Sequence, residues 1–125
     1  MNPSKTLKPT DGELEILQVL WDKQSASVRE VHEVLLLNKE AGYTTTLKLM
    51  QIMFDKKLVT RNSSSKTHIY YPAVSKENTQ NLFLGKMIDS LFSGSSSKLV
   101  MQALGNHSAS PEEIKEIRNF LDQLK

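Results

Sequence analysis

Apolar side chains recur every three or four positions in three successive segments near the start of the chain. The segments run from Thr10 to Lys23, from Ser27 to Leu37 and from about Thr44 to Lys57. This spacing places the apolar residues on one face of a helix. The first two segments open with Thr-x-x-Glu and Ser-x-x-Glu, the capping box that satisfies free backbone N–H groups at a helix N-terminus. The pattern therefore predicts three consecutive amphipathic helices.

The pattern changes its period after the third helix. Residues 58–62 (LVTRN) and 66–71 (KTHIYY) are short and rich in β-branched and aromatic residues, and Pro72 ends the second segment. These features predict a β-hairpin. The connection, Ser63 to Ser65, lacks the Asn-Gly or Gly-Gly pair of a tight turn, so we expect a longer, mobile loop there.

Three further helices are predicted after the hairpin. Ser75 caps the first, the second begins near Ser97 after the polar stretch SGSSS, and Ser110 caps the third with proline at its first position. The last helix has apolar residues at the a and d spacing of a coiled coil, namely Ile114, Ile117, Leu121 and Leu124. Two heptads are too short for an isolated coiled coil. This face therefore packs on its own chain or on a second copy, and the sequence leaves both open.

Three helices followed by a two-stranded hairpin form the winged helix-turn-helix arrangement, in which the third helix enters the major groove of DNA. We therefore predict a mostly α-helical fold with a small β-hairpin wing. The predicted domains are a winged helix at residues 1–73 and a helical region at residues 74–125.

The net charge of +2 is unevenly distributed along the chain. Residues 1–42 carry five basic and seven acidic side chains, and residues 72–125 carry six of each. Residues 43–71 carry five basic side chains against Asp55 alone. The positive excess thus coincides with the third helix and the hairpin, as DNA binding requires. The alternative is that a solvated surface carries this excess of positive charge by chance.

The basic segment holds the residues that we predict to meet DNA. Thr44 is expected to cap the third helix, and the free N–H groups of that helix end suit a phosphate. A threonine also offers a hydroxyl and a methyl group to a base edge, although a phosphate contact is the simpler role. Opposite the apolar stripe lies a helix face that no other part of the chain needs to cover. This face holds Thr45, Lys48, Ile52 and Lys56. The predicted DNA-binding residues are Thr44, Thr45, Lys48, Ile52, Lys56, Arg61 and Lys66.

Composition argues against several other classes of function. The chain has no cysteine, which excludes disulfides and thiolate metal sites and fits a reducing cytoplasm. Its first residues lack the apolar core of a signal peptide, so we expect a soluble, cytoplasmic protein. His32, His68 and His107 fall on a helix surface, a strand and a loop, and no catalytic or nucleotide-binding motif is present. We predict no enzyme activity, no metal and no cofactor.

In order and spacing, six segments of the chain resemble the penicillinase-repressor family of winged-helix regulators, the BlaI/MecI/CopY group. The likeness runs from about Leu7 to Leu124 and rests on TDGELEILQVLW, SVREVHEVL, GYTTTLKLMQ, HIYYPAVS, SLFSGSSSKLVMQAL and SPEEIKEIRNFL. Such proteins are homodimeric repressors of inverted-repeat operators, some of which regulate antibiotic resistance. The resemblance implies that the C-terminal helices form the dimer, through Leu82, Met87, Leu91, Leu99, Val100, Ile114, Ile117, Leu121 and Leu124.

The chain departs from the family pattern at several positions. In the antibiotic-responsive branch, a membrane sensor protease leads to cleavage of the repressor at an Asn-Phe bond. The matching position here is Gln102-Ala103, and the Asn119-Phe120 pair lies in the last helix, so a proteolytic release step is implied without an assigned site. The copper-responsive branch uses a cysteine-rich tail, which is absent here. Ile52 replaces a frequent arginine, and Lys57 replaces a usual helix-ending glycine.

The sequence thus predicts a homodimeric repressor that binds double-stranded DNA. The alternative is a winged-helix assembly module whose exposed face binds a protein, since a fold alone does not define a function. The basic residues of the third helix and hairpin count against that alternative. No small-molecule substrate and no membrane insertion are expected.

Overall fold

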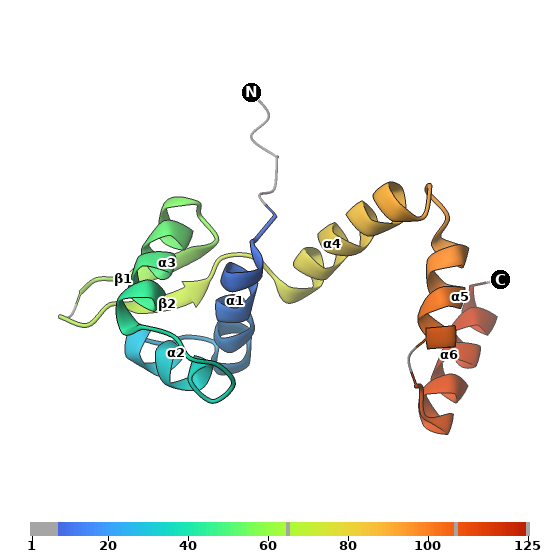
Figure 1. Ribbon diagram of the computed structural model, residues 1–125, viewed down its shortest axis with the longest axis horizontal. Helices are drawn as coiled ribbons and strands as arrows, with labels where there is room; N and C mark the ends of the chain where they lie inside the picture. The colour runs from blue at the N-terminus through green and yellow to red at the C-terminus, as the bar shows by residue number, and fades with distance from the viewer. Residues whose placement is uncertain (1–7, 65, 107, 125) are drawn as a thin grey trace. The chain divides into compact units, whose positions relative to one another are not determined.

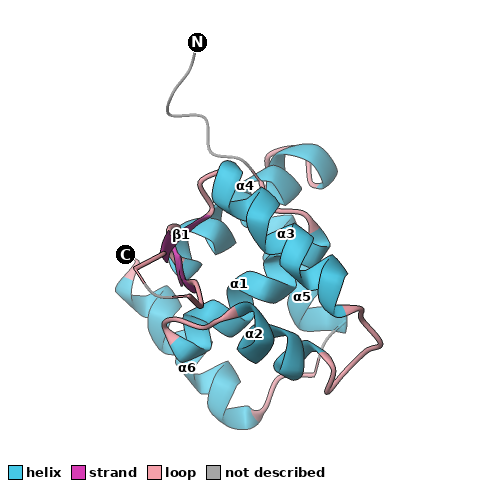
Figure 2. Cartoon of the chain, turned by 90° about the vertical axis from the view of Figure 1, so that its left-hand side faces the viewer, coloured by secondary structure: helices cyan, strands magenta, loops and turns pink. Residues whose placement is uncertain are grey.

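The computed structural model describes residues 8–64, 66–106 and 108–124. This part of the chain is mostly helical and has one two-stranded hairpin (Figures 1 and 2), which confirms the predicted fold class. The elements in chain order are α1 (Asp11–Lys23), α2 (Val28–Leu35), α3 (Tyr43–Asp55), β1 (Val59–Asn62), β2 (Ile69–Pro72), α4 (Lys76–Leu91), α5 (Ser96–Asn106) and α6 (Pro111–Gln123).

Both predicted capping boxes at the start of the chain are present. The hydroxyl of Thr10 accepts from the backbone N–H of Glu13 at 3.2 Å, and the Glu13 carboxylate accepts from the Thr10 N–H at 2.9 Å. Ser27 and Glu30 repeat this exchange at 3.2 and 2.8 Å. These four-residue motifs define where α1 and α2 begin, because they satisfy N–H groups that the helix itself leaves unpaired.

The apolar stripes of the first three helices and the hairpin share one core. Its buried members are Ile16, Leu17, Val19, Leu20, Ala26, Val28, Val31, Met50, Met53, Leu58, Val59 and Tyr70. Tyr70 joins the hairpin to this core, because β2 is bridged on one side by β1 and on the other by Ala26. The Ala26 and Tyr70 backbones exchange hydrogen bonds of 3.0 and 2.8 Å. The hairpin is thereby fixed to the segment that leads into α2.

The start of α3 differs from the prediction that Thr44 caps it. Gly42 is the N-cap residue, and no side chain caps this helix end. The Gly42 carbonyl accepts from the backbone N–H of Thr46 at 3.2 Å, so Thr44 already lies in the first turn. The predicted cap was wrong because the extended backbone of Gly42 starts the helix two residues earlier.

The end of α3 uses a lysine where glycine is favoured. Lys57 has a φ of 69°, in the left-handed region. The Lys57 N–H donates to the Phe54 carbonyl at 3.1 Å, and the Leu58 N–H donates to the Met53 carbonyl at 2.9 Å. This pair of bonds is the Schellman motif that ends many helices. Lys57 therefore adopts a conformation that costs a residue with a Cβ atom about 1 kcal/mol or more.

The hairpin strands are shorter than predicted. Asn62 pairs with Ile69 at the last rung of the antiparallel ladder, so Lys66 and His68 belong to the connecting loop rather than to a strand. The loop is longer than a tight turn, as expected. Ser65, within the expected mobile connection, lies outside the described residues.

The chain divides into two compact units after Phe83, within α4. The first turns of α4 belong to the first unit: Thr79 is buried, and the indole N–H of Trp21 donates to the Val74 carbonyl at 2.9 Å. The Lys8 ammonium lies 4.8 Å from the centre of the Phe83 ring. These contacts extend the first compact unit to Phe83. The functional boundary at residues 73/74 stays a prediction.

The second unit contains the last part of α4 together with α5 and α6. Ser110 caps α6 in a third capping box, with Pro111 at the first helical position, as predicted. No described residue of this unit is buried. Among the described residues, none of the helices combines the length and apolarity needed to cross a membrane.

Candidate nucleic-acid interface

The outward face of α3 is a candidate surface for DNA. Thr44, Thr45 and Lys48 are exposed, and Ile52 is 40% exposed. The opposite face places Met50 in the core with no exposed surface. The helical period separates the two faces, because residues three and four apart share a side of the helix. The structure thus brings four of the seven predicted residues together on one solvent-facing surface.

The third threonine of the series has a structural role. Thr46 is buried, and its hydroxyl lies 3.4 Å from the Gly42 carbonyl and 3.2 Å from Nδ1 of His32 on α2. The His32 ring also meets the Tyr43 ring edge-on, with 5.5 Å between ring centres. His32 is therefore half-buried and packs against the first turn of α3, whereas the sequence placed it on a helix surface. Thr44 and Thr45 are the members of the series left facing solvent.

Lys56 does not lie on the uncovered face that the sequence predicted for it. Its ammonium forms an ion pair of 2.7 Å with the carboxylate of Glu13 on α1. The Lys56 ammonium therefore turns toward α1, whereas the sequence predicted a side chain that no other part of the chain contacts. Its contact with DNA stays a prediction.

Glu13 is a buried charge with several partners. Its side chain is only 1% exposed. Burial by itself raises the pKa of Glu13, but hydrogen bonds from Lys56 and from the Thr10 backbone, together with the Lys56 charge, outweigh it and hold the pKa below its ordinary value. The carboxylate thus stays ionised, and it holds the N-terminal end of α1 against the C-terminal end of α3.

On the hairpin, Arg61 is held against α3. Its guanidinium lies 4.0 Å from the centre of the Phe54 ring, and one of its N–H groups donates to the Tyr70 hydroxyl at 3.5 Å. An arginine has five N–H donors in a planar fork, so this arrangement leaves most of them for a further partner. Arg61 is thereby oriented before any ligand binds. Lys66 in the following loop is exposed.

A recess opens beside α3 on the side of the hairpin. It has a volume of about 500 Å³ and is lined in part by Arg29, Tyr43, Gln51, Lys66 and His68. Lys66 was the one predicted site residue among these. The spacing of Tyr43, Leu47 and Gln51 places them on one edge of the helix, which was a usable sequence signal for Gln51. No local pattern indicated Arg29, which comes from the first turn of α2.

Metal binding finds no support in the described part of the chain. There, no group of three or more histidine, cysteine, aspartate or glutamate side chains is placed to hold a metal ion. The basic side chains are the chemically distinctive groups of this surface. Their arrangement suits an anionic partner.

A three-helix core whose third helix exposes one face, with an adjoining two-stranded hairpin, defines the winged helix-turn-helix, a fold class of DNA-binding regulators. The sequence profile of the penicillinase repressor family matches residues 9–123. The chain therefore belongs to the penicillinase repressor family.

Known relatives match nearly the whole chain. The methicillin resistance regulatory protein MecI of Staphylococcus aureus strain N315 is 24% identical over 120 residues, which cover 96% of this chain and 98% of MecI. The penicillinase repressor of Staphylococcus aureus is 21% identical over 121 residues, or 97% of this chain and 96% of that protein. The solution structure of the DNA-binding domain of the repressor BlaI superposes with a TM-score of 0.53 at 20% identity, covering 59% of this chain and 90% of that domain. This likeness shows the shared winged-helix fold.

Proposed function

We propose that this chain is a cytoplasmic transcriptional repressor that binds an inverted-repeat operator in double-stranded DNA as a homodimer. The observation that carries the proposal is the exposed outward face of α3, with Lys48, beside a hairpin arginine that is already oriented. Membership of the penicillinase repressor family supports the same conclusion. One relative is named a methicillin resistance regulatory protein, and another is named a penicillinase repressor.

The proposed contacts divide into two kinds. Thr44, Thr45, Lys48 and Ile52 enter the major groove, where a lysine can reach guanine and the methyl groups of threonine and isoleucine can meet thymine. Arg61 and Lys66 bind the phosphate backbone beside the groove. Lys56 contributes least to this set, because its charge is already paired with Glu13. Base contacts supply sequence preference, whereas phosphate contacts supply affinity that falls with salt.

The second unit supports the proposed dimer. Many of its apolar side chains are exposed, including Leu84, Met87, Leu91, Val100, Met101, Leu104, Phe120, Leu121 and Leu124. An unburied apolar surface of this kind marks an interaction site. A second copy of the chain would cover the residues predicted for dimerisation, of which Leu99, Ile114 and Ile117 are already half-buried. Leu82 lies in the first unit, just before the unit boundary.

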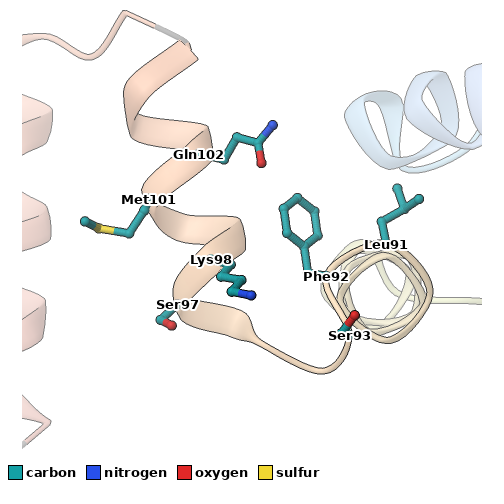
Figure 3. A pocket seen from close by; sticks show the side chains of 7 residues that line it. All are labelled: Leu91, Phe92, Ser93, Ser97, Lys98, Met101 and Gln102. Atoms are coloured by element: carbon teal, nitrogen blue, oxygen red, sulfur yellow. The ribbon is translucent and has the colours of Figure 1, made fainter.

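A recess at the end of α4 adds to this surface (Figure 3). Leu91, Phe92 and Met101 line it together with polar residues, and its volume is about 590 Å³. Figure 3 shows the Phe92 ring between the end of α4 and the helix that carries Gln102. The recess suits an apolar side chain from the second copy.

The proposal includes release from DNA by a signal-dependent step. The family resemblance implies a membrane sensor protease system as the upstream partner. Gln102-Ala103 lies in α5 and Asn119-Phe120 lies in α6, and all four residues are exposed. Helical backbone must unwind locally before a protease can cleave it. Neither pair is assigned as a cleavage site.

Footprinting on the DNA upstream of the protein's own gene tests the proposal. A protected inverted repeat, with half-sites about one helical turn or a multiple of it apart, supports a dimer that binds DNA. The absence of any protection at low salt contradicts the proposal and favours an assembly module that binds a protein. Sedimentation at the same protein concentration establishes whether the chain is dimeric in either case.

A further inference from the structure

The recess beside α3 carries Arg29 and His68, to which the proposed DNA contacts assign no role. It lies between the first turn of α2, the hairpin side of α3 and the loop before β2. Arg29 and Lys66 supply two cationic groups, His68 adds an imidazole ring, and none of the described residues that line the recess is an aspartate or a glutamate. Its volume of about 500 Å³ matches sites that hold small ligands. Such a lining favours an anion.

The floor of the recess is part of the protein core. Ser27, Val28 and Tyr70 line it and are buried. Tyr70 is fixed by its backbone bonds to Ala26, and Ser27 is fixed by its capping box with Glu30. The floor of the recess is therefore fixed before any ligand binds, which lowers the entropy cost of binding.

The first turn of α2 adds further donors. Arg29 lies over the Tyr43 ring, with its guanidinium 5.4 Å from the ring centre. The Glu30 N–H is bonded to the Ser27 hydroxyl, and the other N–H groups of a helix's first turn have no partner within the helix itself. These N–H groups and the positive end of the helix dipole add to the arginine charge. The polar side chain of Gln51 completes the opposite wall.

We infer that this recess is an oxyanion-binding site that takes a phosphate group through Arg29 and Lys66. The phosphate comes either from the backbone of a bound duplex or from a free phosphorylated molecule. The first source rests on the proposed function, whereas the second does not. The guanidinium fork of Arg29 matches two phosphate oxygens, and Lys66 supplies a point charge from the loop.

Titration of the full-length chain with inorganic phosphate, followed by amide NMR, tests the site. Sodium chloride at matched ionic strength is the reference. The amide signals of Val28, Arg29 and His68 are expected to shift and saturate. Arg29→Gln and Lys66→Gln each weaken this phosphate affinity about tenfold, as expected for the loss of a charge-assisted hydrogen bond. Lys23→Gln, a charge-matched control in the last turn of α1, leaves it unchanged.

The same phosphate additions in a DNA-binding assay identify the source. A wild-type DNA affinity that falls as the recess fills, with no such fall in Arg29→Gln, assigns the site to a backbone phosphate. An unchanged DNA affinity assigns it to a free phosphorylated molecule. Linear, non-saturating shifts, or saturation that is equal in wild type and Arg29→Gln, overturn the site. DNA binding measured without phosphate tests the proposed function separately.

Discussion

The ammonium group of Lys56 lies 2.7 Å from the carboxylate of Glu13, across 43 positions of sequence. The pair joins the first turn of α1 to the end of α3. Glu13 is almost fully buried, while 36% of the Lys56 side chain is exposed. A buried carboxylate without a partner is costly, so the lysine is needed to keep this end of α3 in place.

Replacing Lys56 by methionine should therefore destabilise the first unit. We expect the free energy of unfolding to fall by about 1 to 2 kcal/mol, less than for a fully buried pair because water reaches the lysine. Urea denaturation measures the change. Lys39→Met is the matched control, because Lys39 forms an exposed 2.7 Å pair with Glu15 and should cost about 0.5 kcal/mol or less. Equal losses in the two variants would contradict a special role for the Glu13 pair.

The same pair predicts a pH dependence. The pKa of Glu13 in the folded chain is held below its ordinary value of 4.5. A carboxyl group with a lowered folded pKa contributes stability above its unfolded pKa and loses that contribution as pH falls through the folded value. The stability advantage of wild type over Glu13→Gln should accordingly be largest near neutral pH and shrink below pH 4.5. Urea midpoints measured for both proteins between neutral and acidic pH check this, and an advantage that grows on acidification would refute it.

Lys57 is a site where a substitution should stabilise the chain. Its φ of 69° is favourable for glycine and unfavourable for lysine. Lys57→Gly should raise the free energy of unfolding by about 1 kcal/mol. The substitution relieves the strain of a Cβ atom at positive φ, and the greater entropy of glycine in the unfolded chain offsets part of that gain. Lys57→Ala is the control, since it removes the charge and keeps the Cβ atom. Thermal and urea unfolding compare the two, and a glycine variant no more stable than the alanine variant would exclude the strain.

Thr45 is predicted to act on sequence preference. Its exposed position on α3 means that Thr45→Ala should leave the fold intact. If its side chain meets a base, the variant should lose about 1 to 3 kcal/mol of preference for the operator over random DNA. Binding titrations on both duplexes measure the difference. An equal loss on the two duplexes would instead assign Thr45 to the phosphate backbone.

Local sequence patterns were sufficient for the helices and for the caps of α1, α2 and α6. The Thr10-Glu13, Ser27-Glu30 and Ser110-Glu113 boxes are each complete within four residues, so no tertiary contact is needed to recognise them. The period of the apolar residues likewise placed Met50 and Met53 in the core. The cap of α3 was mispredicted because glycine offers no side-chain signal, while the adjacent threonines do.

The contacts around the candidate interface were harder to predict. Lys56 and Glu13 are far apart in sequence, and their pairing depends on how α1 packs on α3. Arg61 meets Phe54 because the hairpin folds back on α3, which hydrophobic periodicity does not encode. Arg29 joins the recess from a helix that the sequence assigned no role in binding. Long-range packing, rather than local propensity, decides which basic side chains remain available.

The proposed DNA-binding surface consists of the outward face of α3, with Lys48, and the basic side chains of the hairpin. The salt dependence of binding tests it most directly, measured for wild type, Arg61→Ala, Lys66→Ala and the charge-matched control Lys23→Ala. Each hairpin variant should reduce the log-log slope by about one unit on every duplex, as one phosphate contact is lost, while the control keeps the wild-type slope. Identical slopes in all four proteins, or no binding at low salt, would show that this surface does not bind duplex DNA.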